Sequence, residues 1–210
     1  MPTPREILVE GAAVLGVRLS ELQVALLERH VALLLKWNKS INLTAVTDPA
    51  QVAELHVVDS LALAPLLGPG LVLDAGAGGG FPGIPLRIAR DDLDVWMVDS
   101  VQKKVAFLKA VQASLQLPGL CARAVRLAGK PEQEGLPRFR AAIARAFAAP
   151  GDWLALAEPY LVPGGSAFCL LGARDQAPDR CGRLVRLREV AYRLPFSGAQ
   201  RKIIEYRLEA

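Results

Sequence analysis

A glycine-rich turn directly follows an apolar segment of strand length, residues 71–75. Asp74 lies near the end of that segment, and Gly76, Gly78 and Gly80 follow it at alternate positions. A strand, a glycine-rich turn and a helix, in that order, form the site at which an open parallel sheet binds an adenosine-containing ligand. The spacing therefore predicts a site for such a ligand at this turn.

The glycines fit two known registers. The register that begins at Asp74 is typical of S-adenosylmethionine sites, and the one that begins at Gly78 formally matches the dinucleotide fingerprint. A pyrophosphate needs free N–H groups at a helix N-terminus, and Pro82 and Pro85 each lack that donor. An acid at Asp74 would also lie unfavourably beside a pyrophosphate. We therefore predict an S-adenosylmethionine site, and a nicotinamide oxidoreductase is the least favoured interpretation.

A second acidic residue supports the prediction of an adenosine-containing ligand. Asp99 follows the next apolar segment, residues 94–98, and lies 25 residues beyond Asp74. An acid at that place can accept hydrogen bonds from both ribose hydroxyls. Both cofactor classes use an acid in this way, so Asp99 supports an adenosine without naming the cofactor.

The end of the predicted fourth strand, Arg145-Ala146-Phe147-Ala148, indicates which atom would be methylated. It has neither the Pro-Pro-aromatic motif of enzymes that methylate exocyclic amines nor the cysteine that cytosine-carbon enzymes need. A ring nitrogen with an exposed lone pair, such as the guanine N7, needs no general base, and positioning supplies much of the acceleration. We predict that Arg145 orients the substrate or the cofactor carboxylate; a surface ion pair is the alternative.

The elements that must position these residues fall into two parts. Residues 1–70 are predicted to form a helical N-terminal extension, and residues 71–210 an S-adenosylmethionine-binding methyltransferase domain. The second part alternates strands with helices, which indicates right-handed crossovers and a parallel sheet. Its last two strands are joined by a short turn and must pair antiparallel. The predicted fold is α/β, a Rossmann-like class I methyltransferase sheet of seven strands. Helices are expected at 4–15, 20–38, 48–67, 82–90, 101–116, 150–161 and 175–184, and strands at 71–75, 94–98, 120–125, 141–145, 166–171, 187–193 and 202–207.

Composition narrows the class further. The chain is 52% hydrophobic over 210 residues, which is ample for a packed core. Residues 1–70 hold five basic and seven acidic residues, a charge of −2. Residues 71–210 hold 20 basic and 14 acidic residues, a charge of +6, and the two parts sum to the net charge of +4. A basic half is compatible with a polyanionic partner and also with an ordinary solvated surface. Three scattered cysteines and two histidines make a metal site improbable. With no signal-peptide pattern and no apolar run that could span a bilayer, we expect a cytoplasmic protein without a membrane partner.

Several motifs, taken in order, resemble the bacterial RsmG family, also called glucose-inhibited division protein B, which methylates a guanine N7 in 16S ribosomal RNA. The resemblance covers nearly the whole chain. Its motifs are the Trp37-Asn38 to Asn42-Leu43-Thr44 segment, His56-x-x-Asp59-Ser60, Asp74 to Pro85, Val98-Asp99-Ser100 with Lys103-Lys104, Arg145 to Ala148, and Leu194 to Gly198.

The resemblance implies S-adenosyl-L-methionine as the cofactor and 16S rRNA or the 30S ribosomal subunit as the partner; we expect a monomer. It implies that Gly76 and Phe81 line the methionine end, that Leu127 and Ala128 lie at the adenine, and that Arg145 lies near cofactor and target base. With the acids and glycines above, the predicted cofactor residues are Asp74, Gly76, Gly78, Gly80, Phe81, Asp99, Ser100, Leu127, Ala128 and Arg145. The predicted RNA-binding residues are Asn42, His56, Asp59, Arg201 and Lys202.

The chain also departs from the family pattern. Ala128 stands where the family usually has glutamate, Leu171 replaces a lysine, and Lys202 replaces a histidine. Two alternatives therefore stay open: a methyltransferase of another RNA or a small molecule, and a non-catalytic RNA-binding assembly protein. For His56, a helix-packing role is at least as well supported as a role in the site.

Overall fold

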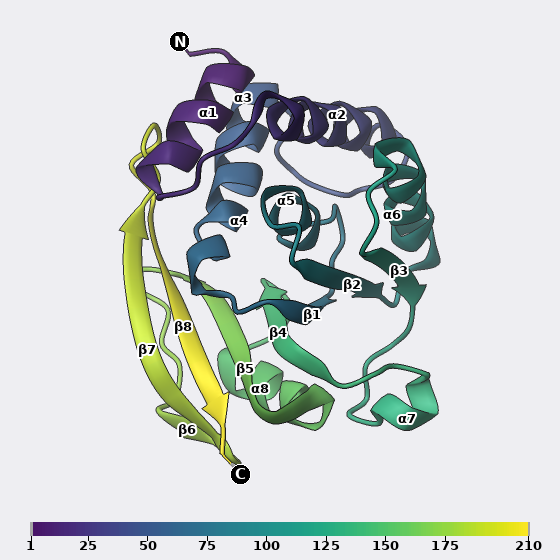
Figure 1. Cartoon of the computed structure of the whole chain (residues 1–210), viewed down its shortest axis with the longest axis vertical. Coiled ribbons are helices and arrows are strands. Elements are labelled where there is room, and N and C mark those ends of the chain that lie inside the picture. The colour runs from purple at the N-terminus through teal and green to yellow at the C-terminus, as the bar shows by residue number, and fades with distance from the viewer. Residues whose placement is uncertain (1, 210) are drawn as a thin grey trace.

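Within residues 2–209, which the computed structural model describes, eight strands form one sheet in the order β3-β2-β1-β4-β5-β8-β7-β6 (Figure 1). The first five strands pair parallel with one another, and β8 pairs antiparallel with both β5 and β7. The expected antiparallel final hairpin is therefore confirmed. The strands are β1 (Gly70–Ala75), β2 (Leu93–Asp99), β3 (Leu120–Ala124), β4 (Phe139–Arg145), β5 (Leu161–Gly172), β6 (Arg180–Cys181), β7 (Leu184–Arg193) and β8 (Gln200–Leu208).

The predicted helix at 175–184 is wrong. Residues 180–181 form β6, which pairs antiparallel with the start of β7. Pro178 has no N–H to donate within a helix, and Gly182 turns the chain with a φ of +55°. This short strand accounts for the difference between the seven strands expected and the eight found.

The strand order reverses direction between β1 and β4, which lie side by side at the centre of the sheet. Helical connections leave the two strands toward opposite faces of the sheet, so a crevice opens beyond their carboxyl ends. Asp74 and Arg145 lie at or near those two ends. The fold thus brings the predicted glycine turn and the predicted target-side arginine to one edge.

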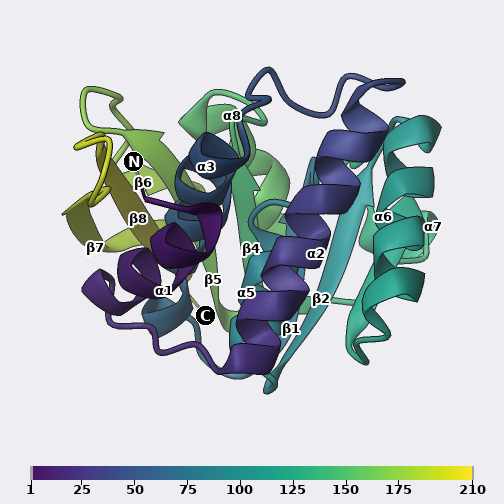
Figure 2. The ribbon, with the colours of Figure 1, turned by 90° about the horizontal axis from the view of Figure 1, so that it is seen from above.

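Helices cover both faces of the sheet, with the larger group on one side (Figures 1 and 2). Alternate residues of β1 show the division, since Val72 packs with the N-terminal helices and Leu73 packs with α8. The helices are α1 (Pro4–Val14), α2 (Glu21–Asn38), α3 (Pro49–Val52), α4 (Asp59–Leu61), α5 (Gly83–Ala89), α6 (Gln102–Leu115), α7 (Pro131–Glu134) and α8 (Pro150–Ala157). None of the helices in this described range combines the length and apolarity needed to cross a membrane.

The N-terminal helices begin at good capping residues. Ser20 caps α2 by accepting from the Gln23 N–H, and Asp48 caps α3 by accepting from the Gln51 N–H at 2.8 Å. The expected continuous helix over 48–67 ends at Leu61 instead. Pro65, within a 3-10 turn (Ala64–Leu66), has no N–H to donate and would crowd the carbonyl four residues before it.

A π-helical segment, Ala53–Val58, joins α3 to α4. Such segments are rare and occur frequently at functional sites. This one carries His56 and leads directly into Asp59. The N-terminal helices share a hydrophobic core with one face of the sheet, so they hold these two residues against it. The division of the chain at residue 70 stays a prediction.

Candidate active site

The turn after β1 is built on glycines with positive φ. Gly76, Gly78 and Gly80 have φ of +67°, +52° and +82°, a region that side chains with a Cβ rarely adopt. The turn is held to the neighbouring strand because Gly76 and Ala77 both donate to the Val98 carbonyl, at 2.8 and 3.1 Å. The alternate glycines are thus required by the backbone path of the turn.

Asp99 connects the end of β2 to this turn. Its Oδ2 accepts from the Gly78 N–H at 3.1 Å, and its Oδ1 accepts from the Val101 N–H at 2.8 Å. Each carboxylate oxygen has a second lone pair, so the residue keeps capacity for ligand hydroxyls. Asp99 lines a cavity of ≈ 360 Å³ together with the predicted residues Gly76, Ser100 and Leu127.

Asp74 lies beneath the turn and is fully buried. Its Oδ2 accepts from the Gly83 N–H at 2.9 Å, and its Oδ1 has no hydrogen-bond partner among the described residues. Burial raises the pKa of this carboxyl to about 7. Since Gly83 is the first residue of α5, Asp74 occupies the N–H that a pyrophosphate would need.

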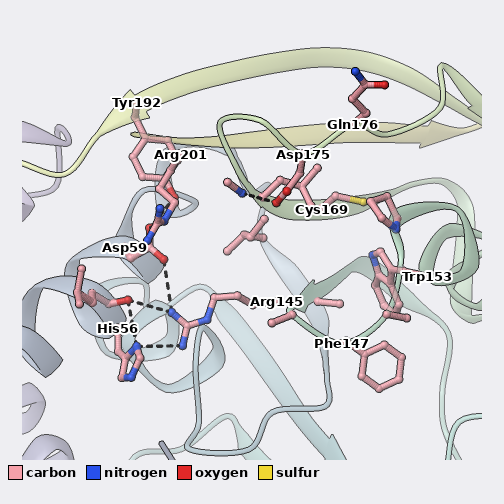
Figure 3. A pocket seen from close by; sticks show the side chains of 18 of the residues that line it. His56, Asp59, Arg145, Phe147, Trp153, Cys169, Asp175, Gln176, Tyr192 and Arg201 are labelled. Atoms are coloured by element: carbon pink, nitrogen blue, oxygen red, sulfur yellow. Dashed lines mark hydrogen bonds and ion pairs between the residues drawn. The ribbon is translucent and has the colours of Figure 1, made fainter. Parts of the chain in front are cut away.

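Arg145 lies at the centre of a second, larger cavity of ≈ 680 Å³ (Figure 3). Its guanidinium donates to the Leu55 carbonyl at 3.2 Å and faces Asp59 Oδ2 and His56 Nδ1, each at 3.4 Å. The same group lies 5.5 Å from the centre of the Phe81 ring. Residues of the π-helical segment and its continuation therefore fix the arginine that ends β4.

Asp59 also receives contacts from the final hairpin. Its Oδ1 accepts from the Tyr192 hydroxyl at 2.8 Å, and Arg201 Nε lies 3.8 Å from the same oxygen. Burial and the Asp59 charge raise the pKa of Tyr192, so its hydroxyl stays protonated and donates. Three segments distant in sequence thus meet at one carboxylate.

His56 is neutral at physiological pH. Burial, followed by the charge of Arg145, lowers its pKa to about 4. Its Nε2 lies 2.7 Å from the Thr44 hydroxyl. The ring is therefore a neutral contact between the Thr44 segment and Arg145.

Phe147 separates the two cavities and lines both of them. Its ring covers Gly76 so closely that a Cβ on the glycine would lie 2.4 Å from Phe147 Cδ2. The preceding Ala146 has a φ of +51°, an uncommon conformation for alanine that aims the next side chain into the crevice. The motif Arg145 to Ala148 does not by itself indicate a role for this phenylalanine.

Not every predicted residue lines a cavity. Among the residues that the structure describes, His56, Asp59, Arg145 and Arg201 line the larger cavity, and Asn42 and Lys202 line neither. Lys202 Nζ lies 3.5 Å from Glu189 instead. The two cavities are also not lined by Asp74, Gly78, Gly80, Phe81 and Ala128. The binding roles predicted for these residues stay predictions.

Cys169 is a cavity residue that sequence reasoning missed. It lies on β5, beside Trp153, and no local motif marks it. Burial raises the pKa of its thiol to about 12, so it is protonated at physiological pH. A protonated thiol is a poor nucleophile.

Comparison with known proteins agrees with this arrangement. The family model described as rRNA small subunit methyltransferase G matches residues 23–199. The ribosomal RNA small subunit methyltransferase G of Myxococcus xanthus is 46% identical, over 96% of both chains. The protein of that name from Burkholderia thailandensis is 38% identical, over 99% of this chain and 93% of its own.

Solved structures support the fold. An O-methyltransferase from Bacillus cereus, in complex with SAH, superposes with a TM-score of 0.58 at 16% identity, over 85% of this chain and 90% of its own. An S-adenosylmethionine-dependent methyltransferase from Aquifex aeolicus gives a TM-score of 0.54 at 15% identity, over 77% and 94%. The expected methyltransferase sheet is confirmed. The sequence matches, over nearly the whole chain, show that this chain belongs to the rRNA small subunit methyltransferase G family.

Proposed function

We propose that the protein transfers a methyl group from S-adenosyl-L-methionine to the N7 of a guanine in 16S rRNA of the small ribosomal subunit. The observation that carries the proposal is that the two cavities share Ala146 and Phe147, with Arg145 beside them. A group transfer between two ligands needs two adjoining sites that meet at the reacting atoms. The family supplies the substrate class.

The smaller cavity fits the cofactor better than it fits a dinucleotide. Asp99 offers carboxylate oxygens for the ribose, and Leu127 offers an apolar wall for the adenine. The helix N-terminus that would bind a pyrophosphate is engaged, because Gly83 donates to Asp74 and Pro82 and Pro85 have no N–H. When bound, S-adenosylmethionine supplies an electrophilic methyl group on its sulfonium.

The groups around Arg145 suit a nucleophile that needs no base. The guanine N7 carries an exposed lone pair, and the adjacent O6 accepts hydrogen bonds from arginine. Asp59 is engaged with Tyr192 and Arg145, and His56 is neutral. We infer that Arg145 orients the base through O6 while Asp59 and His56 fix the guanidinium.

Basic residues are compatible with an RNA partner. Arg201 lies in the larger cavity, and the second part of the chain carries the excess of basic residues. The affinity for a polyanionic substrate falls steeply as the salt concentration rises, whereas the affinity for a small neutral substrate does not change in this way. The monomeric state and a cytoplasmic location stay predictions.

The test is methyl transfer from labelled cofactor to small ribosomal subunits, and to their naked 16S rRNA, from a strain that lacks this gene. We expect labelled N7-methylguanine at one position of the 16S rRNA. Arg145→Ala is expected to abolish transfer, and Arg193→Ala serves as a surface control, because Arg193 is exposed at the C-terminal end of β7 and lines neither cavity. Methylation of another atom, or RNA binding without transfer, would overturn the proposal.

A further inference from the structure

The loop after β3, residues 125–130, carries the wall of the cavity proposed for the adenine. Leu127 lines that cavity, whereas Ala128 is exposed and does not line it. The loop has no regular secondary structure, so other groups must hold its backbone. Two side chains, Glu134 and Tyr160, accept its N–H groups.

Glu134 and Tyr160 together bind three consecutive loop amides. Glu134 Oε1 accepts from Ala128 at 2.9 Å and from Lys130 at 3.0 Å. The Tyr160 hydroxyl accepts from Ala128 at 3.1 Å and from Gly129 at 2.8 Å. It donates in turn to Glu134 Oε2 at 2.5 Å, which closes the network.

This network ties the loop to a rigid part of the molecule. Tyr160 ends the 3-10 turn Glu158–Tyr160 between α8 and β5, and it is fully buried in the core beneath the sheet. Burial, and then Glu134, raise the pKa of Tyr160 to about 12, so its hydroxyl keeps the proton that it donates. The buried Tyr160 ring therefore holds the surface loop in place through its hydroxyl and through the Glu134 carboxylate.

We propose that Glu134 and Tyr160 are positioning residues that fix the loop backbone directly after Leu127, and so hold Leu127 in place for the adenosine part of the cofactor. The inference rests on the proposed cofactor. Glu134 supplies a carboxylate to the Ala128 backbone from six residues further along the chain. The Ala128 N–H is shared by two acceptors and is not free for the adenine, whereas Leu127 lines the cavity.

The test compares Glu134→Ala, Glu134→Gln and Tyr160→Phe with the matched control Glu132→Ala. Glu132 lies in the same short helix, but its carboxylate pairs with Arg138 at 2.8 Å and does not contact the loop. Calorimetry would measure binding of S-adenosylhomocysteine and of adenosine, and steady-state kinetics would give KM for the cofactor and kcat for transfer to small subunits. Circular dichroism would confirm that each variant is folded.

Glu134→Ala is expected to weaken the binding of both ligands and to raise KM for the cofactor roughly tenfold, with kcat at saturating cofactor unchanged. The reason is that the loop loses its hydrogen bonds to a charged carboxylate, which are stronger than those between neutral groups. Glu134→Gln keeps one acceptor oxygen and should recover part of the affinity. Tyr160→Phe should resemble Glu134→Gln, and Glu132→Ala should match the wild type.

Two results separate the possible failures. If the wild-type protein does not bind S-adenosylhomocysteine, the proposed cofactor is wrong. If the wild type binds it, and the folded Glu134 and Tyr160 variants bind it equally well, the positioning proposal alone is wrong. A fall in kcat with an unchanged KM would also overturn it, because it would place the effect at the target side. Should Glu134→Ala fail to fold, Glu134→Gln and Tyr160→Phe decide the question by the same measurements.

Discussion

Replacing Asp74 by asparagine should make the protein more stable above neutral pH. The carboxyl is fully buried, and only one of its oxygens has a partner, the Gly83 N–H. Asparagine has almost the same shape and can keep that hydrogen bond with its carbonyl oxygen. It differs from the wild type chiefly in that it cannot ionise.

The magnitude follows from the pKa. Burial raises the pKa of Asp74 from 3.8 to about 7, so between these values the folded protein holds a proton that the unfolded chain has lost. Stability from this group is therefore fully present below pH 3.8 and falls as pH rises toward 7. The whole shift corresponds to about 4 kcal/mol, at about 1.4 kcal/mol for each pH unit.

Two histidines act in the opposite direction and must be separated from Asp74. Burial lowers the pKa of both His30 and His56 to about 4, so their contribution is present above pH 6.5 and is lost as pH falls toward 4. The wild type alone would show a partly cancelled pH profile. The difference in unfolding free energy between Asp74→Asn and the wild type removes the histidine contribution.

Urea unfolding of both proteins, followed by circular dichroism from pH 4 to pH 8.5, measures this difference. We expect it to grow in favour of Asp74→Asn as pH rises and to level off above pH 7. A difference that stays flat across this range would refute the reasoning, since it would mean that Asp74 ionises in the folded protein as it does in the unfolded chain.

Three further predictions concern the proposed reaction. Gly76→Ala should weaken S-adenosylhomocysteine binding at least tenfold by calorimetry, because its φ of +67° costs alanine about 1–2 kcal/mol and the added Cβ meets Phe147. The matched control Gly16→Ala, with φ of +77° and open space around it, should lose stability but keep the wild-type affinity. The same affinity in both variants would contradict the argument. Arg145→Lys should lower methyl transfer about tenfold or more, because an ammonium cannot hold the contacts of a planar guanidinium; wild-type transfer rates would show that positive charge alone suffices. Affinity for 16S rRNA, measured by filter binding, should fall steeply between about 50 and 200 mM salt, and a flat salt profile would favour a small-molecule substrate.

Much of the fold was predictable because its signals are local. The turn after β1 needs glycine at the three positions where φ is positive, so its backbone conformation is written in consecutive residues. The short link after β7 permits only an antiparallel return. The helix expected at residues 175–184 does not form because Pro178 and Gly182 disfavour a helix and the helical pattern there is weak. The third expected helix ends early because Pro65 also disfavours a helix.

The sequence by itself determined the glycine turn after β1, the acid that ends β2 and the resemblance to the family. Only the tertiary structure decided which side chains meet: Asp59 with Tyr192 across 133 residues, and Glu134 with Tyr160 across 26. It also decided that Asp74 is buried beneath the turn and that Phe147 lies over Gly76. Backbone preferences act between neighbours in the chain, whereas these contacts depend on how helices and strands pack, which no short motif specifies.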